Sequence, residues 1–448
     1  MKRYYFVGIG GSGMSPLAQI LCQRGNWVGG SDRNFDRNSH QDFFSKLQML
    51  GIHLFPQDGS AVSGDIDCMV VSTAIEHNNR ELAGARARNI PVVHRADLLA
   101  RLFNESHGIG VAGTSGKSTV TGMVAAILDA AGMDPTFING GIIKSFISDD
   151  LIGNCRNGSS KIMVAEIDES DGSIIHFSPR VGVITNISKD HKELDELKEL
   201  FQTFAAHTSQ QLIVNGDNPP ARETAAHDLL TFGLQGDNDI FPADVAFSPQ
   251  AVRFRLQDTP FSLNVPGEHN VYNALAAIAV GVTLNIPLAT MRDGLASFAG
   301  IQRRLEIVGK KKGITVVDDF GHNPDKIVAS IRALRPMGKR LLILFQPHGY
   351  GPTKFLLREL GRAFSSALLS TDFLVCLNIY DAGGTADRTV TSQDLIDTVT
   401  GPGLFYAPDR SDALALIKET ARKDDIIAVM GARDDSLRLF AQRILEEI

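Results

Sequence analysis

The sequence has little of what marks secreted or membrane-spanning proteins. Only four of its 448 residues are cysteine, and they are far apart, at positions 22, 68, 155 and 376. No Cys-x-x-Cys pair occurs, which excludes a zinc ribbon or a disulfide framework and favours free thiols in a reducing cytosol. No stretch reaches 18 uninterrupted apolar residues, so the sequence predicts no membrane-spanning segment.

Runs of like charge are also missing. The net charge is −7 and the two signs are mixed along the chain, which argues against nucleic acid or an anionic membrane as a partner. Two basic residues near the N-terminus precede an apolar stretch, but glycines interrupt it within a few residues. It is therefore interpreted as a first strand, not a signal peptide. We expect a cytoplasmic protein; the sequence sets no oligomeric state.

Short apolar runs alternate with helical runs along the chain, which predicts α/β units with parallel sheets. The length allows about three domains. We place boundaries near residues 105 and 299, so that the expected domains are 1–105, 106–298 and 299–448. Two runs in the middle segment, AVRFRL and FSLNV, alternate in polarity and predict antiparallel strands.

A first glycine-rich loop, FVGIGGSGM, follows an apolar run and precedes a helix-like run. Gly8, Gly10 and Gly13 form the G-x-G-x-x-G pattern of a dinucleotide-binding turn, and Asp32 lies about 20 positions further on, where such a site needs an acidic residue. These residues alone leave two ligands equally open: a nicotinamide dinucleotide, or another ribose diphosphate.

A second glycine-rich loop, VAGTSGKSTVTGM, lies between an expected strand and an expected helix. The general Walker pattern needs glycine where this chain has Val111, but the narrower pattern Gly-Thr-x-Gly-Lys-[Ser/Thr] fits Gly113 to Ser118. Backbone N–H groups of such a loop and the following helix N-terminus hold phosphate, Lys117 reaches the β/γ-phosphates, and Ser118 offers its hydroxyl to Mg²⁺.

Both loops in one chain favour a particular class of enzyme. A nicotinamide oxidoreductase rarely needs a separate ATP loop and a third α/β unit. A ligase that joins a nucleotide-linked acid to another molecule needs both loops.

Several further motifs carry a family resemblance, and they run in order from residue 6 to residue 348. The chain resembles the Mur ligases, the ATP-dependent amino-acid-adding enzymes of peptidoglycan assembly, and is nearest to the branch that joins L-alanine to UDP-N-acetylmuramate. The matching stretches are FVGIGGSGMS, VVSTAI, GTSGKST, EIDESDGS, TNISKDH, EHNVYNALAAIAV, RRLEIVG, VDDFGHNP and FQPH.

The resemblance implies a three-domain fold and a reaction. A Rossmann-like N-terminal domain would hold the UDP-sugar, a P-loop ATPase-like central domain would hold ATP, and a Rossmann-like C-terminal domain would close on ATP and bind the incoming amino acid. ATP would phosphorylate the carboxylate to an acyl phosphate, which the amine then attacks. The implied UDP-sugar residues are Gly8, Gly10, Gly11, Gly13, Asp32, Ser72 and Thr73.

The resemblance also implies the ATP, metal and catalytic residues. Those at ATP are Gly113, Thr114, Ser115, Gly116, Lys117, Ser118, Thr119, Asn270, Asn273 and Arg304. Those at Mg²⁺ are Ser118, Glu166 and His191. Those implied in catalysis are Lys117, Glu166, His191, Arg304, Asp319 and His322.

Structural roles compete with some of these assignments. Asn270 is also a candidate helix N-cap, and Arg304 a candidate partner in a boundary salt bridge. An acidic cluster of Asp168, Glu169 and Asp171 either orients substrate or metal, or supplies carboxylates to a helix start.

The match breaks where the incoming amino acid is held. The alanine-adding enzymes have arginines at the positions of Gly349 and Pro352, and neither residue can build a bidentate carboxylate clamp. Arg433 is a candidate replacement, and we expect the acceptor to contact His348, Tyr350 and Arg433. Ser115 replaces a usual histidine. L-alanine is the first expected acceptor; the alternatives are another amino acid, a short peptide, or a non-catalytic nucleotide-binding role.

Overall fold

The computed structural model describes residues 1–190, 192–224, 229–381, 387–401 and 403–448. The chain forms two compact units. The first unit comprises residues 1–242 and 272–299, and the second comprises 243–271 and 300–448. In the described part of the chain, no helix is both long and apolar enough to cross a lipid bilayer.

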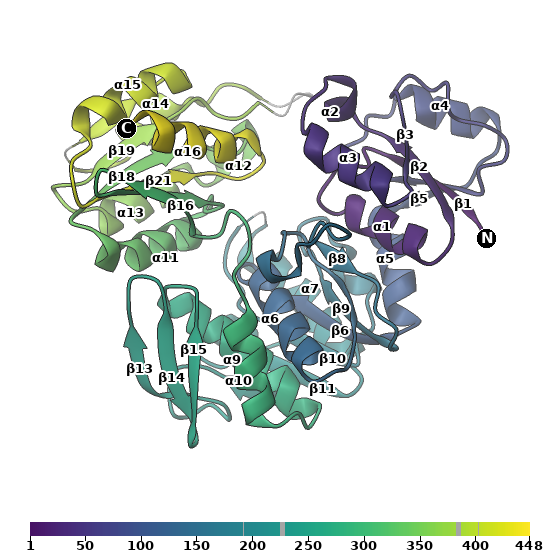
Figure 1. The fold of residues 1–448 in the computed structure, drawn as a ribbon, viewed down its shortest axis with the longest axis horizontal. Helices are drawn as coiled ribbons and strands as arrows, with labels where there is room; N and C mark the ends of the chain where they lie inside the picture. Colours follow the sequence, from purple (N-terminus) through teal and green to yellow (C-terminus); the bar gives the residue numbers. More distant parts are fainter. Residues whose placement is uncertain (191, 225–228, 382–386, 402) are drawn as a thin grey trace. The chain divides into compact units, whose positions relative to one another are not determined.

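The first sheet of the first unit is wholly parallel, with strand order β3-β2-β1-β4-β5 (Figure 1). Tyr5 and Phe6 are fully buried on opposite faces, because successive side chains of a strand alternate. The strands are β1 (Arg3–Val7), β2 (Trp27–Ser31), β3 (His53–Phe55), β4 (Cys68–Val71) and β5 (Val92–His94). The helices are α1 (Ser15–Gln23), α2 (Arg33–Asp36), α3 (Gln41–Met49), α4 (Arg80–Ala87) and α5 (Arg95–Asn104).

The second sheet of the first unit has the order β12-β11-β10-β6-β9-β7-β8 and is parallel except for β8. Its strands are β6 (His107–Ala112), β7 (Thr136–Ile138), β8 (Cys155–Arg156), β9 (Ile162–Glu166), β10 (Val181–Ile184), β11 (Gln211–Asn215) and β12 (Leu229–Phe232). Its helices are α6 (Lys117–Ala130), η1 (Lys144–Phe146), η2 (Ser173–His176), α7 (Leu194–His207), α8 (Pro219–Arg222) and α10 (Leu288–Ser297), while α9 (Glu268–Thr283) runs from the second unit into the first.

The second unit holds a small antiparallel sheet and a larger mixed one (Figure 1). The small sheet is β13 (Ala243–Phe247), β14 (Val252–Leu256) and β15 (Thr259–Leu263). The larger has the order β16-β17-β21-β18-β19-β20, from β16 (Glu306–Lys311), β17 (Ile314–Asp319), β18 (Arg340–Phe345), β19 (Phe373–Cys376), β20 (Leu404–Tyr406) and β21 (Asp425–Met430). Only the edge pair β16–β17 is antiparallel among its described pairs.

Helices cover both faces of this larger sheet. Ile343 packs with the core of α11, α13 and α14, whereas its neighbours Leu342 and Leu344 pack with that of α15 and α16. Parallel strands buried on both faces are continuously apolar for this reason. The helices are α11 (Pro324–Leu334), η3 (Arg335–Met337), α12 (Tyr350–Phe355), α13 (Leu357–Ala367), α14 (Ser392–Asp397), α15 (Arg410–Thr420) and α16 (Ser436–Glu447).

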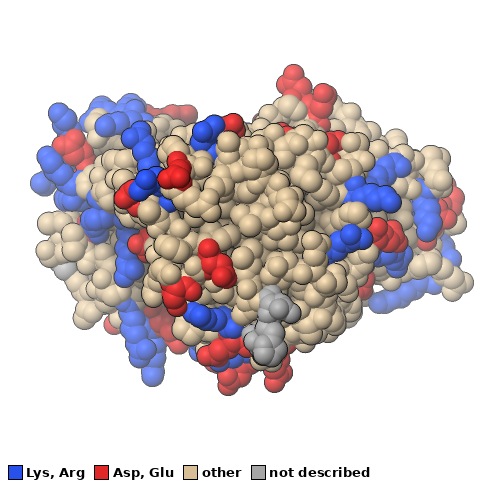
Figure 2. Space-filling view, turned by 90° about the horizontal axis from the view of Figure 1, so that it is seen from below, with Lys and Arg blue, Asp and Glu red and all other residues tan. Residues whose placement is uncertain are grey.

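The predicted α/β class is confirmed, with three largely parallel sheets. The predicted antiparallel pair is confirmed as β14 and β15. All four cysteines are free thiols, and burial raises the pKa of Cys376 to about 12. Acidic and basic side chains stand near each other in small groups on the face drawn in Figure 2, with uncharged surface between them.

Candidate functional site

The phosphate loop lies in the first unit, between the carboxyl end of β6 and the start of α6 (Figure 1). Gly113 and Gly116 have φ of +132° and +89°, which other residues rarely adopt. A Cβ on Gly113 would lie 2.1 Å from the Thr185 hydroxyl, and one on Gly116 would lie 2.5 Å from the Asn273 side-chain oxygen. Both positions therefore require glycine.

The Lys117 ammonium is held inside this loop. Its Nζ donates to the Gly113 carbonyl at 2.7 Å and to the Glu169 carboxylate at 2.8 Å. Burial disfavours the charge, but the attraction of Glu169, Asp168 and Glu166 outweighs it and raises the pKa of Lys117. The structure thus gives Glu169 a partner that the sequence did not identify.

Ser118 and Glu166 place oxygen atoms side by side at the start of α6 and the end of β9. The Ser118 hydroxyl donates to Glu166 Oε1 at 3.0 Å, and the Gly140 amide donates to Oε2 at 2.7 Å. Hydroxyl and carboxylate oxygens suit Mg²⁺, which is usually completed by water and substrate phosphates. The described residues include no group of three or more His, Cys, Asp or Glu that could hold a metal ion. His191 lies outside the described residues.

The loop after β10 braces the phosphate loop. The Asn186 side chain accepts from the Ser115 amide at 3.0 Å and donates to the Ser115 carbonyl at 3.1 Å. Thr114 and Ser188 exchange two further hydrogen bonds, at 3.0 and 3.1 Å. This bracing was missed at the sequence level, although the stretch TNISKDH contains Asn186 and Ser188.

The two asparagines on α9 have different surroundings. Asn273 lies against Gly116 of the phosphate loop. The Asn270 amide donates to the Pro266 carbonyl at 2.7 Å. The helix begins at Glu268, so the alternative role of Asn270 as its N-cap is wrong. Thr119 lies in the first turn of α6.

The first glycine-rich loop lies at the carboxyl end of β1. Since β1 pairs with β2 and with β4, the loop is flanked by Asp32 after β2 and by Ser72 and Thr73 after β4. Such crevices at the carboxyl ends of parallel strands bind nucleotides. Asp32 accepts from the amides of Gly10 at 2.9 Å and Asn34 at 2.8 Å, so its carboxylate shapes the loop.

Arg95 connects this loop to the acidic cluster within the first unit. Its Nη1 lies 2.8 Å from where a Cβ on Gly13 would stand. Its Nη2 lies 3.2 Å from Asp171 and 4.0 Å from Asp168. Sequence reasoning missed Arg95, because it lies outside the matching motifs.

In the second unit, two arginines form a tight turn before β16. Arg303 and Leu305 have φ of +60° and +47°, a strained conformation for residues with side chains. Arg303 is buried, donates to the Gly431 carbonyl at 2.8 Å and lies 2.9 Å from Asp435. The Arg304 guanidinium lies 4.6 Å above the centre of the Phe320 ring.

Asp319 is the last residue of β17, and its carboxylate stabilises this turn by hydrogen bonds. Its carboxylate accepts from the Leu305 amide at 2.9 Å, the Gly321 amide at 3.0 Å and the Ser330 hydroxyl at 2.7 Å. Nearby, burial and then Lys326 hold the pKa of His322 well below its usual value, so the ring is neutral at neutral pH. Asp319 is thus a structural acceptor within its own unit.

The predicted acceptor residues gather at the carboxyl edge of the larger sheet. The loops after β18 and β21 carry His348 and Arg433, and these strands are neighbours. The rings of His348 and His322 lie 4.6 Å apart. Arg433 Nη1 lies 3.3 Å from where a Cβ on Gly349 would stand, so its guanidinium reaches the position from which the expected arginine is missing.

Tyr350 begins α12, next to this position, and the Arg388 guanidinium lies 5.7 Å from the centre of its ring. On the same helix, the Lys354 ammonium pairs with Asp387 at 2.6 Å.

The fold and this site define an α/β protein of the phosphate-loop class, with a second glycine-rich crevice in its first sheet. Comparison with known families gives a closer identification. Three descriptions match in order: "Mur ligase family, catalytic domain" over residues 3–107, "Mur ligase middle domain" over 111–281, and "Mur ligase, glutamate ligase domain" over 303–433.

Individual relatives match along almost their whole length. The UDP-N-acetylmuramate–L-alanine ligase of Desulfatibacillum aliphaticivorans is 36% identical, covering 97% of this chain and 96% of its own. That of Geobacter sp. (strain M21) is 36% identical, covering 96% and 95%. The solved structure of the UDP-N-acetylmuramate–alanine ligase MurC from Thermotoga maritima is 26% identical, with a TM-score of 0.81, covering 100% and 99%. The chain belongs to the Mur ligase family.

Proposed function

We propose that this chain is an ATP-dependent ligase that joins the carboxylate of UDP-N-acetylmuramate to the amino group of L-alanine, in peptidoglycan synthesis. The observation that carries the proposal is the phosphate loop, with Lys117 drawn into it, in a chain that aligns end to end with ligases of that name. The domain roles expected from the sequence belong to this proposal: UDP-sugar at 1–105, ATP at 106–298 and the acceptor at 299–448.

The proposed reaction needs the carboxylate to be activated. Transfer of the γ-phosphoryl group of ATP to a carboxylate oxygen gives an acyl phosphate and ADP; attack by the amine gives a tetrahedral intermediate, which expels phosphate and leaves the amide. Little covalent work falls to side chains, which position two anions and neutralise charge. Lys117 and the amides of residues 113–118 take that part in the first unit, and Arg304 takes it in the second.

Mg²⁺ fits the oxygen pair of Ser118 and Glu166, with His191 as the further ligand that the family resemblance implies. When bound, the ion would neutralise phosphate charge. Asp319 supports the reaction indirectly, because its carboxylate holds the Leu305 amide and so the turn that presents Arg304. Neutral His322 adds no positive charge beside the incoming ammonium.

Arg433 is the proposed anchor for the acceptor carboxylate, with His348 and Tyr350 beside it. Its guanidinium occupies the space beside Gly349, on the loop where the alanine-adding relatives carry an arginine. A guanidinium binds a carboxylate with two parallel hydrogen bonds. Arg433 would supply this group from the loop after β21 in place of an arginine on the loop after β18.

The test is phosphate release from ATP and Mg²⁺ in the presence of UDP-N-acetylmuramate, across single amino acids and short peptides. We expect turnover with L-alanine. Arg433→Ala should raise the KM for alanine while leaving the KM for ATP unchanged, and Arg443→Ala, an exposed arginine paired with Glu447, serves as the control. Turnover only with another amino acid or a peptide would contradict L-alanine as the acceptor but not the proposed reaction. If no acceptor gives phosphate release although ATP still binds, UDP-N-acetylmuramate is not the substrate.

A further inference from the structure

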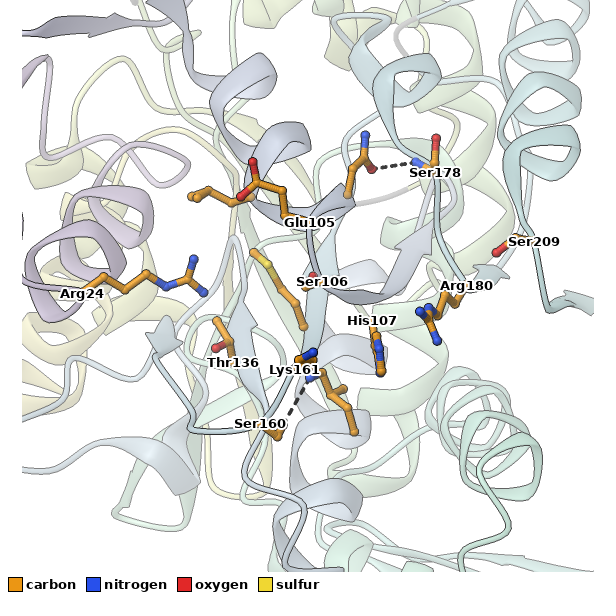
Figure 3. Close-up of a pocket in the computed structure, with 14 residues that line it drawn as sticks. Arg24, Glu105, Ser106, His107, Thr136, Ser160, Lys161, Ser178, Arg180 and Ser209 are labelled. Atoms are coloured by element: carbon orange, nitrogen blue, oxygen red, sulfur yellow. Dashed lines mark hydrogen bonds between the residues drawn. The ribbon is translucent and has the colours of Figure 1, made fainter. Parts of the chain in front are cut away.

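A pocket of about 630 Å³ lies in the first unit, at the amino ends of the second sheet's strands (Figure 3). Its wall includes His107 at the start of β6, Ile162 at the start of β9 and Arg180, which precedes β10. The phosphate loop follows the opposite end of β6. Six residues of extended chain separate the two edges, about 20 Å. The pocket is therefore distinct from the proposed ATP site.

The pocket is cationic, although the chain as a whole carries a net charge of −7. Arg24, Lys161 and Arg180 line it, against a single carboxylate among the described lining residues, Glu105. Figure 3 shows Arg24 pointing in from one side, with Lys161 in the middle and Arg180 on the far side. Cations gathered in a concave site raise the local concentration of anions.

Two of these cations are not neutralised within the described structure. Neither Lys161 nor Arg180 has a side-chain hydrogen bond or ion pair among the described residues. By contrast, Arg95, Lys117 and Arg156 of the same unit each contact a carboxylate. The ammonium of Lys161 and the guanidinium of Arg180 are donors that bind phosphate oxygens, and Ser160, beside Lys161 in the chain, adds a hydroxyl to the pocket wall.

Arg24 is oriented by contacts between α1 and the segment between β8 and β9. Its Nε donates to the Asn157 side-chain oxygen at 3.0 Å, and the backbone N–H of Asn157 donates to the Gln23 side-chain oxygen at 3.2 Å. This arrangement anchors the guanidinium while its two Nη groups remain available. A pocket of this size also exceeds the needs of a free ion and is in the range that holds small organic ligands, roughly 300–1,000 Å³.

We propose that this pocket is a second anion site, which binds the phosphate group of a small phosphorylated molecule on Lys161 and Arg180, with Arg24 on the opposite side facing the rest of the ligand. The same chemistry would admit free orthophosphate. The size of the pocket favours a phosphomonoester with a polar organic body, which would bring α1 and the strand starts of the second sheet into contact with one ligand.

The test uses the full chain with Lys117→Ala, so that the phosphate loop does not compete for the probe. Ribose 5-phosphate and orthophosphate are titrated separately by calorimetry. The charge-reversed pair Lys161→Glu and Arg180→Glu is compared with a matched pair, Arg358→Glu and Arg362→Glu, which are exposed on α13. We expect the pocket pair to weaken binding by at least about tenfold and the matched pair to leave it unchanged.

The outcomes separate clearly. Tighter binding of ribose 5-phosphate than of orthophosphate supports a phosphomonoester ligand. Equal affinity contradicts the phosphomonoester and shows a site for free orthophosphate. Absence of binding by both probes, or equal loss in both variant pairs, overturns the site. The neutral pair Lys161→Gln and Arg180→Gln repeats the test without introducing new negative charge, and should give a smaller loss in the same direction.

Discussion

At the scale of single residues, the Lys117 ammonium lies between a backbone carbonyl and the Glu169 carboxylate. Glu169 therefore has a role in the protein without nucleotide, since it keeps a buried cation compensated. A phosphate that enters the loop must compete with Glu169 for the same ammonium. Within the acidic cluster, Glu169 contacts Lys117 directly, Asp168 attracts both Lys117 and Arg95, and Asp171 pairs with Arg95.

Lys117→Ala should lower ATP-dependent phosphate release by roughly 10²–10³-fold, because it removes the positive charge aimed at the transferred phosphoryl group. The measurement is the initial rate with saturating substrates. The control is Lys198→Ala on α7. The Lys198 ammonium lies 3.1 Å from the Glu223 carboxylate and takes no part in the phosphate loop. Equal rates for the Lys117 variant and the parent chain would contradict the assigned role.

Asp318 makes a second residue-scale prediction. Burial raises its pKa to about 6, although the neighbouring Arg303 lowers it. The native carboxyl therefore holds a proton that the unfolded chain releases at about pH 4. Between about pH 4 and pH 6 the native state binds more protons, so this group's contribution makes the free energy of unfolding fall as pH rises.

Asp318→Asn removes that contribution. The difference in unfolding free energy between the parent chain and this variant should change by about 3 kcal/mol across the window. Urea unfolding at several pH values between about 4 and 7 measures it. Asp258→Asn, in the exposed turn between β14 and β15, is the matched control. Parallel pH profiles for Asp318→Asn and the parent chain would contradict the prediction.

At the scale of elements, one glycine in the loop before α6 and one just after α6 are needed for different reasons. Gly113, before the helix, has no room for a side chain and an unusual backbone. Gly132, after the helix, has φ of +67° and open space around it. Gly113 is needed because a side chain there would collide with Thr185. Gly132 is needed only because the backbone turns there with a positive φ.

Gly113→Ala should therefore lower phosphate release by at least about tenfold, because the loop must move away from Thr185 and a loss of about 1.4 kcal/mol is enough for that factor. Gly132→Ala should leave the rate unchanged and cost about 1–2 kcal/mol of stability. Rates and thermal unfolding of both variants test this contrast. Similar rates in the two variants would show that the space around Gly113 does not matter.

The sequence could predict the central strands, because parallel strands buried on both faces are continuous apolar runs, as in RLLILF of β18. It missed short edge strands such as β3 and β20, each of three residues, which carry too little pattern. It predicted the phosphate loop from local order alone. It could not predict the contacts of Lys117 with Glu169 or of Gly116 with Asn273, because these join residues far apart in the chain.

At the scale of the whole molecule, the chain forms two compact units although its sequence contains three α/β segments. Buried polar contacts join the first two sheets: the Asn154 side chain contacts Ser15 and Gln19, each at 3.1 Å. Such contacts are costly to leave unpaired, so they tie the two sheets to one another. No local pattern predicts them, because they span more than a hundred residues.

Calorimetry should accordingly show separate unfolding transitions for the two units. Mg²⁺ with a non-hydrolysable ATP analogue at about 100 times its Kd should stabilise the first unit by about 2.7 kcal/mol, since that unit holds the phosphate loop. Lys117→Ala should abolish the shift. A single transition, or a shift confined to the second unit, would contradict this division.

The loop at Gly349 also bears on how such a chain can change over generations. Its φ of +145° excludes ordinary side chains, and the Arg433 guanidinium stands beside it. A single mutation that places arginine at 349 meets both a strained backbone and a neighbouring cation of like charge. Arginine at 349 is therefore disfavoured while Arg433 is present, and we expect chains that share this loop to keep Gly349 and Arg433 together.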